Sequence, residues 1–136
     1  MKSYLVIGMG RFGSAIATEL YRMKHEVMAI DEHEKDIIPI MNHVTDAIVG
    51  DAKDEAVLRS LGVQNFDCVI VAIARLEDNI LISMMLKEMG AHSLFCKAQS
   101  ELHAKILSSI GVDRIIRPEH DMGKQIAHSL ETDSGK

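Results

Sequence analysis

The sequence has 136 residues, of which 47% are hydrophobic and 26% are charged, and this composition suits one globular domain with a core of its own. It carries 15 basic and 20 acidic residues, which gives a net charge of −5. This balance argues against nucleic acid as the main partner, because proteins that bind the phosphate backbone usually present a basic face.

The first predicted elements enclose a glycine-rich loop. An apolar run over residues 4–7 leads into Gly8-Met9-Gly10-Arg11-Phe12-Gly13, and a helix is predicted over residues 11–24. In a G-x-G-x-x-G loop the first glycine allows a sharp turn, the second lets backbone approach a pyrophosphate, and the third lets the helix pack close to the strand. The first turn of the helix would offer unpaired N–H groups and its positive dipole end to phosphates.

A second apolar run, residues 27–30, ends in Asp31, 21 residues after Gly10. In a Rossmann unit such an acidic residue accepts hydrogen bonds from ribose hydroxyls, and its charge disfavours a 2′-phosphate. NADP is therefore the least expected nucleotide. Taken alone, Asp31 is equally well explained as a helix cap or a turn residue, but together with the glycine loop it predicts nucleotide binding.

The rest of the chain repeats the strand–helix order. A short helix limited by Pro39 is expected to turn Ile37, Ile38 and Met41 inward. Further strands are predicted at residues 46–49, 66–74, 94–98 and 112–116, and further helices at residues 54–61, 77–89, 100–110 and 118–130. Ser100 and Gly111 are expected to cap the helix at residues 100–110, and its inner face would be Leu102, Ile106 and Ile110. The first helix is expected to carry one apolar stripe, made of Phe12, Ala15, Ile16, Leu20 and Met23. The unbroken apolar strand at residues 66–74 is typical of a parallel sheet covered on both faces. We expect a Rossmann-like, doubly wound α/β fold, with six parallel strands in the order 3-2-1-4-5-6.

In this fold class ligands lie at the carboxyl ends of the strands, next to the switch point between the first and fourth strands. Arg11 could pair with a phosphate or be a solvated residue at the helix start, and Asp51 could lie near an adenine or be a turn residue. Lys97 could contact a phosphate or a carboxylate, or extend into solvent from an edge strand. The candidate cofactor-binding residues are Gly8, Met9, Gly10, Arg11, Phe12, Gly13, Asp31, Glu32, Asp51, Ala52, Ala72, Ile73, Ala74 and Lys97.

Other chemistry-bearing residues give weaker signals. The seven histidines show no metal-ligand spacing and are expected on the surface, and no nucleophile–base arrangement is evident, so no enzyme activity is predicted. Glu119 could be a favourable charge at a helix start, or reach a cation or a partner subunit. The two cysteines, Cys68 and Cys96, are expected in the core and not in a disulfide.

The last predicted helix carries Met122, Ile126 and Leu130 at every fourth position. No later segment could cover this stripe, so we expect it to bind a partner subunit, and the alternative is packing onto its own sheet. The longest apolar run, residues 68–74, is too short to span a bilayer, and no signal peptide is evident. A cytoplasmic location is therefore expected.

These motifs together resemble a known family. Residues 6–14, 25–31, 50–52, 66–74, 97–98 and 111–119 are similar to the RCK N-terminal domain, also called KTN or TrkA-N. The Arg-Phe-Gly loop and the Pro-Glu-x-Asp-Met-Gly segment most resemble the KtrA-type regulatory subunits of bacterial potassium uptake systems. On this resemblance, residues 1–131 would form the nucleotide-binding domain, residues 132–136 would form a polar tail, and the C-terminal RCK lobe would be absent.

The resemblance implies binding of ATP, ADP or NAD(H), and gating of a membrane potassium channel or transporter through ligand-dependent rearrangement of a homodimer. Such dimers would assemble into an octameric ring at the inner membrane. Lys97 would lie at the base of the nucleotide site, and Glu119 would face a divalent cation at the dimer interface. Two alternatives remain: the cofactor domain of an NAD-dependent oxidoreductase, for which the chain has little room, and an interaction module that binds no nucleotide.

Overall fold

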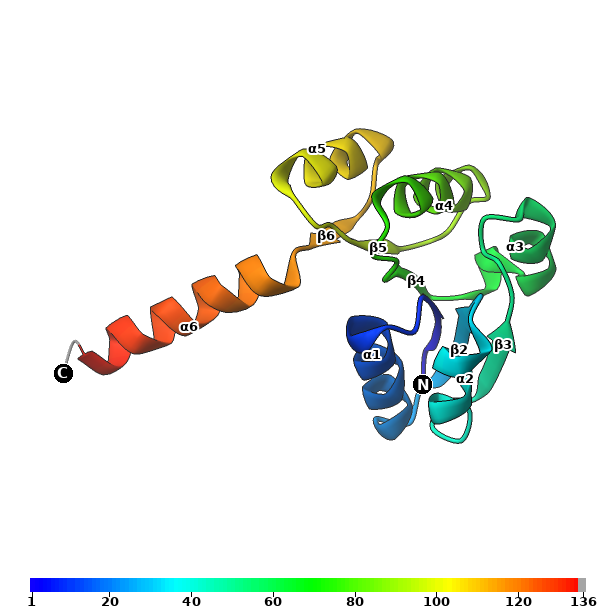
Figure 1. Ribbon diagram of the computed structural model, residues 1–136, viewed down its shortest axis with the longest axis horizontal. Coiled ribbons are helices and arrows are strands. Elements are labelled where there is room, and N and C mark those ends of the chain that lie inside the picture. The colour runs from blue at the N-terminus through cyan, green and yellow to red at the C-terminus, as the bar shows by residue number, and fades with distance from the viewer. Residues whose placement is uncertain (135–136) are drawn as a thin grey trace.

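The computed structural model describes residues 1–134 as a sheet of six parallel strands that alternate with helices (Figure 1). The strands are β1 (Ser3–Ile7), β2 (Glu26–Asp31), β3 (Asp46–Val49), β4 (Cys68–Val71), β5 (Leu94–Lys97) and β6 (Arg114–Ile116). The helices are α1 (Arg11–Arg22), α2 (Glu34–Ile37), α3 (Glu55–Leu61), α4 (Leu76–Glu88), α5 (Glu101–Ile110) and α6 (Pro118–Ser134), with the 3-10 helices η1 (Ile38–Ile40) and η2 (Val63–Asn65).

The strand order is β3-β2-β1-β4-β5-β6, as predicted. β1 lies at the centre, and its last residue, Ile7, pairs with Ile30 of β2 on one side and with Val71 of β4 on the other. The chain changes direction of winding between β1 and β4. The glycine loop that follows β1 therefore lies between connections that lead to opposite sides of the sheet. This is the expected position of a ligand crevice in a doubly wound sheet.

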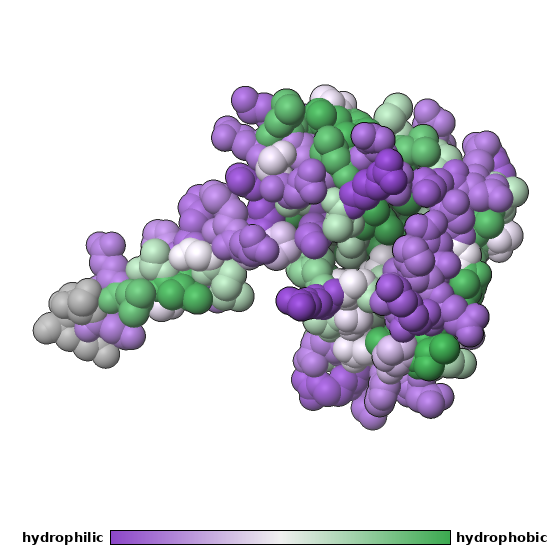
Figure 2. Space-filling model, viewed as in Figure 1, coloured by the Kyte–Doolittle hydropathy of each residue, from purple (hydrophilic) through white to green (hydrophobic). Residues whose placement is uncertain are grey.

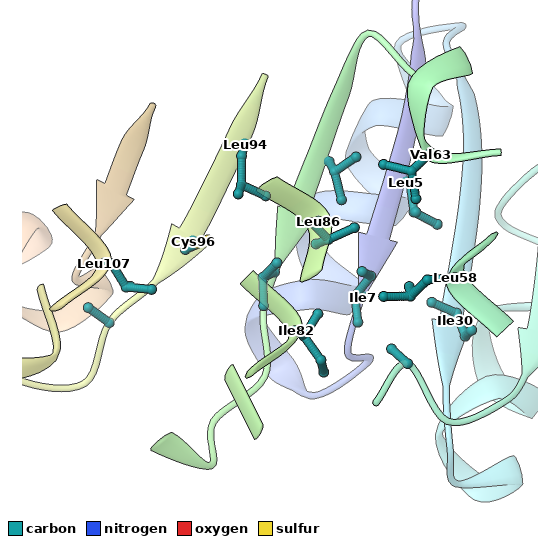
Figure 3. Close-up of a cluster of buried hydrophobic side chains, with 14 residues drawn as sticks. Leu5, Ile7, Ile30, Leu58, Val63, Ile82, Leu86, Leu94, Cys96 and Leu107 are labelled. Carbon is teal, nitrogen blue, oxygen red and sulfur yellow. The ribbon is translucent and has the colours of Figure 1, made fainter. Parts of the chain in front are cut away.

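Both faces of the sheet are buried. Alternate residues of β1 enter different apolar clusters, because successive side chains of a strand point to opposite faces. Leu5 and Ile7 pack on the face covered by α3, α4 and α5, where they meet Leu58 and Leu86 (Figure 3). Val6 packs on the opposite face, with residues of α1, α2 and η1. The unbroken apolar sequence of β4 is thus explained, since all four of its residues are buried.

Local capping signals in the sequence are confirmed. The Ser100 side chain accepts a hydrogen bond from the His103 N–H and caps α5, and Gly111 ends the same helix in a left-handed conformation, φ 96°. Asp54 is the N-cap of α3 and not its first residue, because its side chain accepts from the Ala56 N–H. β4 is shorter than predicted, since its pairing with β5 ends at Val71.

The predicted inner faces of three helices are wrong in part. Ile38 and Met41 are 56% and 52% exposed, because the chain tightens into η1 around Pro39 and brings Ile40 inward in place of both. On α5, Leu102 is 67% exposed, and His103 with Leu107 forms the buried face. The stripe predicted on α1 is confirmed at Ile16 and Leu20, which pack against the core, but Ala15 and Met23 are exposed, whereas Gly13 and Ala17 are buried.

Helix α6 projects away from the sheet (Figure 1). Its stripe residues Met122, Ile126 and Leu130 are 52%, 52% and 63% exposed, and apolar surface runs along the helix in Figure 2. Packing of this stripe onto its own sheet is therefore wrong. The helix continues to Ser134, so residues 132–134 of the predicted polar tail are helical, and residues 135–136 lie outside the described part of the chain. Within residues 1–134, no helix has the length and apolar character needed to cross a membrane.

Candidate functional site

A cavity of about 960 Å³ opens at the carboxyl ends of the strands, bounded by the loops after β1 to β5 and by the start of α6. This volume lies in the range of sites that bind small molecules. All the predicted site residues except Met9 and Gly13 line it: Gly8, Gly10, Arg11, Phe12, Asp31, Glu32, Asp51, Ala52, Ala72, Ile73, Ala74, Lys97 and Glu119. The fold thus brings together side chains from segments far apart in the sequence.

The three glycines of the loop have different surroundings, so a side chain would have a different effect at each position. Gly8 has φ 100°, and a Cβ there would lie 3.0 Å from the backbone of Ala72. A Cβ at Gly13 would lie 1.8 Å from the Gly8 carbonyl oxygen, so close packing of α1 against the loop requires glycine. A Cβ at Gly10, in contrast, would meet no atom within 4 Å. The fold itself therefore does not require glycine at position 10, whereas a ligand lying against that backbone would.

The N-terminus of α1 is open toward the cavity. Its N-cap is Gly10, which has no side chain to cap the helix, and the first turn contains no acidic residue. The helix itself therefore supplies no carboxylate to the unpaired N–H groups and the positive end of its dipole. An anionic group is the ligand that such a helix end favours.

Asp31 ties the glycine loop to the tip of β2. Its Oδ2 accepts a hydrogen bond of 2.8 Å from the Met9 N–H, and its Oδ1 accepts one of 2.8 Å from the His33 N–H. The Met9 side chain is itself buried in the cluster below α1, which explains why it does not line the cavity. A carboxylate offers about four lone-pair sites, so Asp31 keeps acceptor capacity for a ribose hydroxyl. The sequence predicted the ribose contact but gave no sign of the link to Met9.

Basic side chains border the part of the cavity near α1. The Lys97 Nζ lies 5.7 Å from the centre of the Phe12 ring, a cation–π arrangement that holds the ammonium group at the cavity wall. Arg11 and Arg117 also line the cavity. Arg11, the first residue of α1, and Lys97, beside Phe12, lie on the side where the open helix end already favours an anion.

Acidic side chains dominate the part of the cavity near β2 and β3, where one lysine joins them. The Lys53 Nζ lies 3.8 Å from Glu32, 3.9 Å from Asp51 and 3.6 Å from Asp78. Asp51 also accepts a hydrogen bond from the Lys53 N–H at 2.9 Å, which gives it the turn role that the sequence left open. Lys53 and Asp78 were not predicted from the sequence, because only the fold brings the loop after β3 beside the start of α4.

One group of potential metal ligands also depends on the fold. Asp31, His33 and Asp36 place ligand atoms within 4.8 Å of one another, although the sequence showed no histidine with metal spacing. Both Asp31 oxygens already accept backbone hydrogen bonds or lie beside His33, so this arrangement has a structural explanation. The predicted metal residue, Glu119, is exposed on the first turn of α6 and lines the cavity.

Behind the cavity lies a buried polar pair that the sequence did not predict. Asn79 on α4 is fully buried, and His103 on α5 is 1% exposed, so the prediction that every histidine lies on the surface is wrong for His103. Their side chains are joined by a hydrogen bond of 2.9 Å. Burial lowers the pKa of His103 below its ordinary value of about 6.5, because an imidazolium is poorly solvated there.

Comparisons with known proteins agree with this architecture. The sequence profile of the TrkA-N domain matches residues 4–118. The Ktr system potassium uptake protein A of Bacillus subtilis (strain 168) is 45% identical to the chain over 134 residues, a match that covers 98% of this chain and 60% of the relative. The chain thus spans less than two thirds of that relative's length.

Two solved structures have a similar fold. The NAD(P)-binding domain of an exopolyphosphatase-related protein from Archaeoglobus fulgidus superposes with a TM-score of 0.85 at 20% identity, covering 97% of this chain and 99% of that one. A structure of GsuK bound to ADP superposes with a TM-score of 0.79 at 25% identity, covering 97% of this chain and 34% of that one.

Proposed function

The chain belongs to the TrkA-N domain family, and from that premise we propose that it is the nucleotide-binding regulatory part of a potassium uptake system. The observation that carries the proposal is the open helix end at Gly10, which lines a large cavity and where an added Cβ would meet no protein atom within 4 Å. A regulatory role is favoured over an oxidoreductase role because a 45% identical relative is a potassium uptake protein.

The nucleotide would span the cavity from its basic part to its acidic part. Its phosphates would lie against the main-chain amides that follow Gly10, at the start of α1, with Arg11 and Lys97 supplying positive charge. The ribose would be held by Asp31, and the base would lie near Asp51 and Ala52. ATP, ADP and NAD(H) all present a diphosphate and free ribose hydroxyls, so the donor set fits each of them.

Regulation would follow from a shift in population between dimer arrangements. A nucleotide can move such an equilibrium only by binding one arrangement more tightly than the other. Helix α6, whose apolar stripe is exposed, would supply the homodimer contact, and Glu119 at its start would face a divalent cation beside the nucleotide. Dimers would assemble into a ring that acts on a membrane potassium channel or transporter from the cytoplasmic side.

The test compares the affinity of the chain for ATP and for ADP by isothermal titration calorimetry. We expect Arg11→Ala to weaken ATP binding more than ADP binding, because the guanidinium would contact the third phosphate; a loss of about tenfold is the size of one charge-assisted hydrogen bond. Arg59→Ala is the control, since Arg59 pairs with Glu55 on α3 and does not line the cavity.

Equal loss of affinity for both nucleotides would exclude Arg11 as the sensor of the third phosphate. Failure of the unaltered chain to bind ATP, ADP or NADH, with no change in its melting temperature at millimolar nucleotide, would overturn the proposed function itself.

A further inference from the structure

The walls of the cavity are held by hydrogen bonds behind it. The ladder between β4 and β5 ends at the pair Val71 and Cys96, and beyond that point both chains continue into the lining of the cavity. The Asn79 Nδ2 donates one hydrogen bond to the Ile73 carbonyl oxygen and one to the Lys97 carbonyl oxygen, each 2.9 Å long. The two N–H groups of one amide therefore replace the missing rung between the two strand ends.

Asn79 is in turn held by His103. The His103 Nδ1 accepts a hydrogen bond of 3.1 Å from the Gln99 N–H, so this nitrogen carries no proton, and the proton of the neutral ring is on Nε2. Nε2 then donates to the Asn79 Oδ1 at 2.9 Å. This bond fixes which way the Asn79 amide faces, because its oxygen meets a donor and its nitrogen meets two carbonyl acceptors.

We infer that Asn79 and His103 are positioning residues of the proposed nucleotide site: by joining the ends of β4 and β5 they set the distance between the Ile73 and Lys97 walls of the cavity. The inference rests on the proposed function, because it concerns the same cavity. Neither side chain lines the cavity, so any effect on binding must pass through the strand ends.

Removal of the Asn79–His103 pair should change the geometry of the cavity. Without the Asn79 amide, two carbonyl groups lose their common donor and must move toward water or another donor. Any such movement displaces the backbone beside Ala74 and Ala98, which also line the cavity. A ligand that contacts several walls at once is sensitive to shifts of this kind, because its binding depends on a preformed geometry.

The test uses variants of both residues and a matched control on the same helix. Ser83 lies one turn after Asn79 on α4 and is equally buried, but its Oγ contacts the Cys96 side chain at 3.1 Å and not a strand-end carbonyl. Affinity for ADP is measured by calorimetry, well below the melting temperature of every variant. We expect Asn79→Ala and His103→Leu to bind ADP about tenfold more weakly, and Ser83→Ala to stay within about twofold of the unaltered chain.

His103→Gln is the conservative variant, since its amide nitrogen can replace Nε2 as the donor to Asn79 while its bond to Gln99 is lost. We expect it to bind only about threefold more weakly than the unaltered chain. If Asn79→Ala and His103→Leu do not fold, the difference between His103→Gln and Ser83→Ala decides the question. In the nucleotide-free protein, the backbone amide NMR signals of Ala74 and Ala98 should move in His103→Gln and not in Ser83→Ala.

Two results distinguish failure of the proposed function from failure of the positioning role. If the unaltered chain binds no ADP, the proposed function is wrong, whatever the variants do. If the unaltered chain binds ADP and the Asn79 and His103 variants bind it equally well, or if Ser83→Ala loses as much affinity as they do, the positioning role is wrong and the proposed function stands.

Discussion

Single residues of the glycine loop differ in what they contribute. The sequence motif gives Gly10 and Gly13 different roles, and the structure shows why: the packing of α1 needs glycine at position 13, whereas a Cβ at position 10 would meet no atom within 4 Å. The motif correctly predicted the location of the loop, because strand, turn and helix follow one another along the chain. It did not predict the bond from Met9 to Asp31, which depends on the position of β2 beside β1.

The two glycines should respond oppositely to the same substitution. Gly13→Ala should lower the free energy of unfolding by about 3 kcal/mol or more, because its Cβ would overlap the Gly8 carbonyl oxygen and force α1 outward. Gly10→Ala should leave that free energy within about 0.5 kcal/mol, since its φ of −70° suits alanine, yet weaken ADP binding. Urea unfolding and calorimetry measure the two quantities. Loss of stability in Gly10→Ala would show that position 10 has a packing role.

His103 gives the protein a pH dependence with a definite sign. Its pKa is lowered in the fold, so below the ordinary value of about 6.5 the unfolded chain binds a proton that the folded chain does not. The contribution of His103 to stability is therefore fully present above pH 6.5 and is lost as the pH falls toward the folded pKa. Urea unfolding between pH 7.5 and 5 should show a smaller decline for His103→Gln than for the unaltered chain. Identical slopes would mean that the pKa of His103 is the same in the folded and unfolded chains.

At the scale of elements, the sequence predicted the residues that cap helices more accurately than it predicted which face of a helix is buried. Ser100 and Gly111 cap α5 through contacts within a few residues, so their local sequence suffices. The inward face of a helix depends on its partners across the sheet. On α5 a histidine faces inward and Leu102 faces outward, since His103 meets the buried Asn79 side chain. A hydrophobic pattern alone could not indicate a polar residue whose partner lies on another helix.

Two leucines of α5 test this assignment of faces. Leu107 is fully buried in the cluster on the α3–α4–α5 face, whereas Leu102 is 67% exposed. Leu107→Ala should lower the free energy of unfolding by about 2–5 kcal/mol, through lost burial and the cavity left behind. Leu102→Ala, the matched control, should change it by no more than about 0.5 kcal/mol. Similar losses for the two substitutions in urea unfolding would contradict the observed orientation of α5.

At the scale of the whole molecule, the topology followed from the alternation of strands and helices, because right-handed crossovers leave few orders open. The residues at strand ends were predictable for the same reason. Contacts between side chains of distant segments were not predictable: Lys53 meets Asp78, and Asn79 meets His103, only after the sheet has brought these segments together. Which charges surround the cavity is thus set by tertiary structure.

The exposed stripe on α6 predicts self-association. Met122, Ile126 and Leu130 form an apolar surface that a second copy of the helix would remove from water. Analytical ultracentrifugation should therefore show a dimer that Ile126→Asp dissociates, with its dissociation constant raised at least about tenfold. Gln125→Asp introduces the same charge on the adjacent residue, outside the stripe, and should leave the dimer intact. A monomer at all concentrations would contradict the prediction.

The junction between β6 and α6 connects the cavity to a helix that projects from the domain, so a change of angle there would move the far end of the helix. Arg117, Pro118 and Glu119 at this junction line the cavity, while the 17 residues of the helix extend beyond the domain. At a rise of 1.5 Å per residue the arm is roughly 25 Å long, so a tilt of about 10° at the junction would displace its far end by roughly 4 Å. A small displacement at the rim of the cavity could leave the sheet unchanged. The length of α6 would still convert it into a larger displacement at the far end of the helix, which would reorient any subunit bound there.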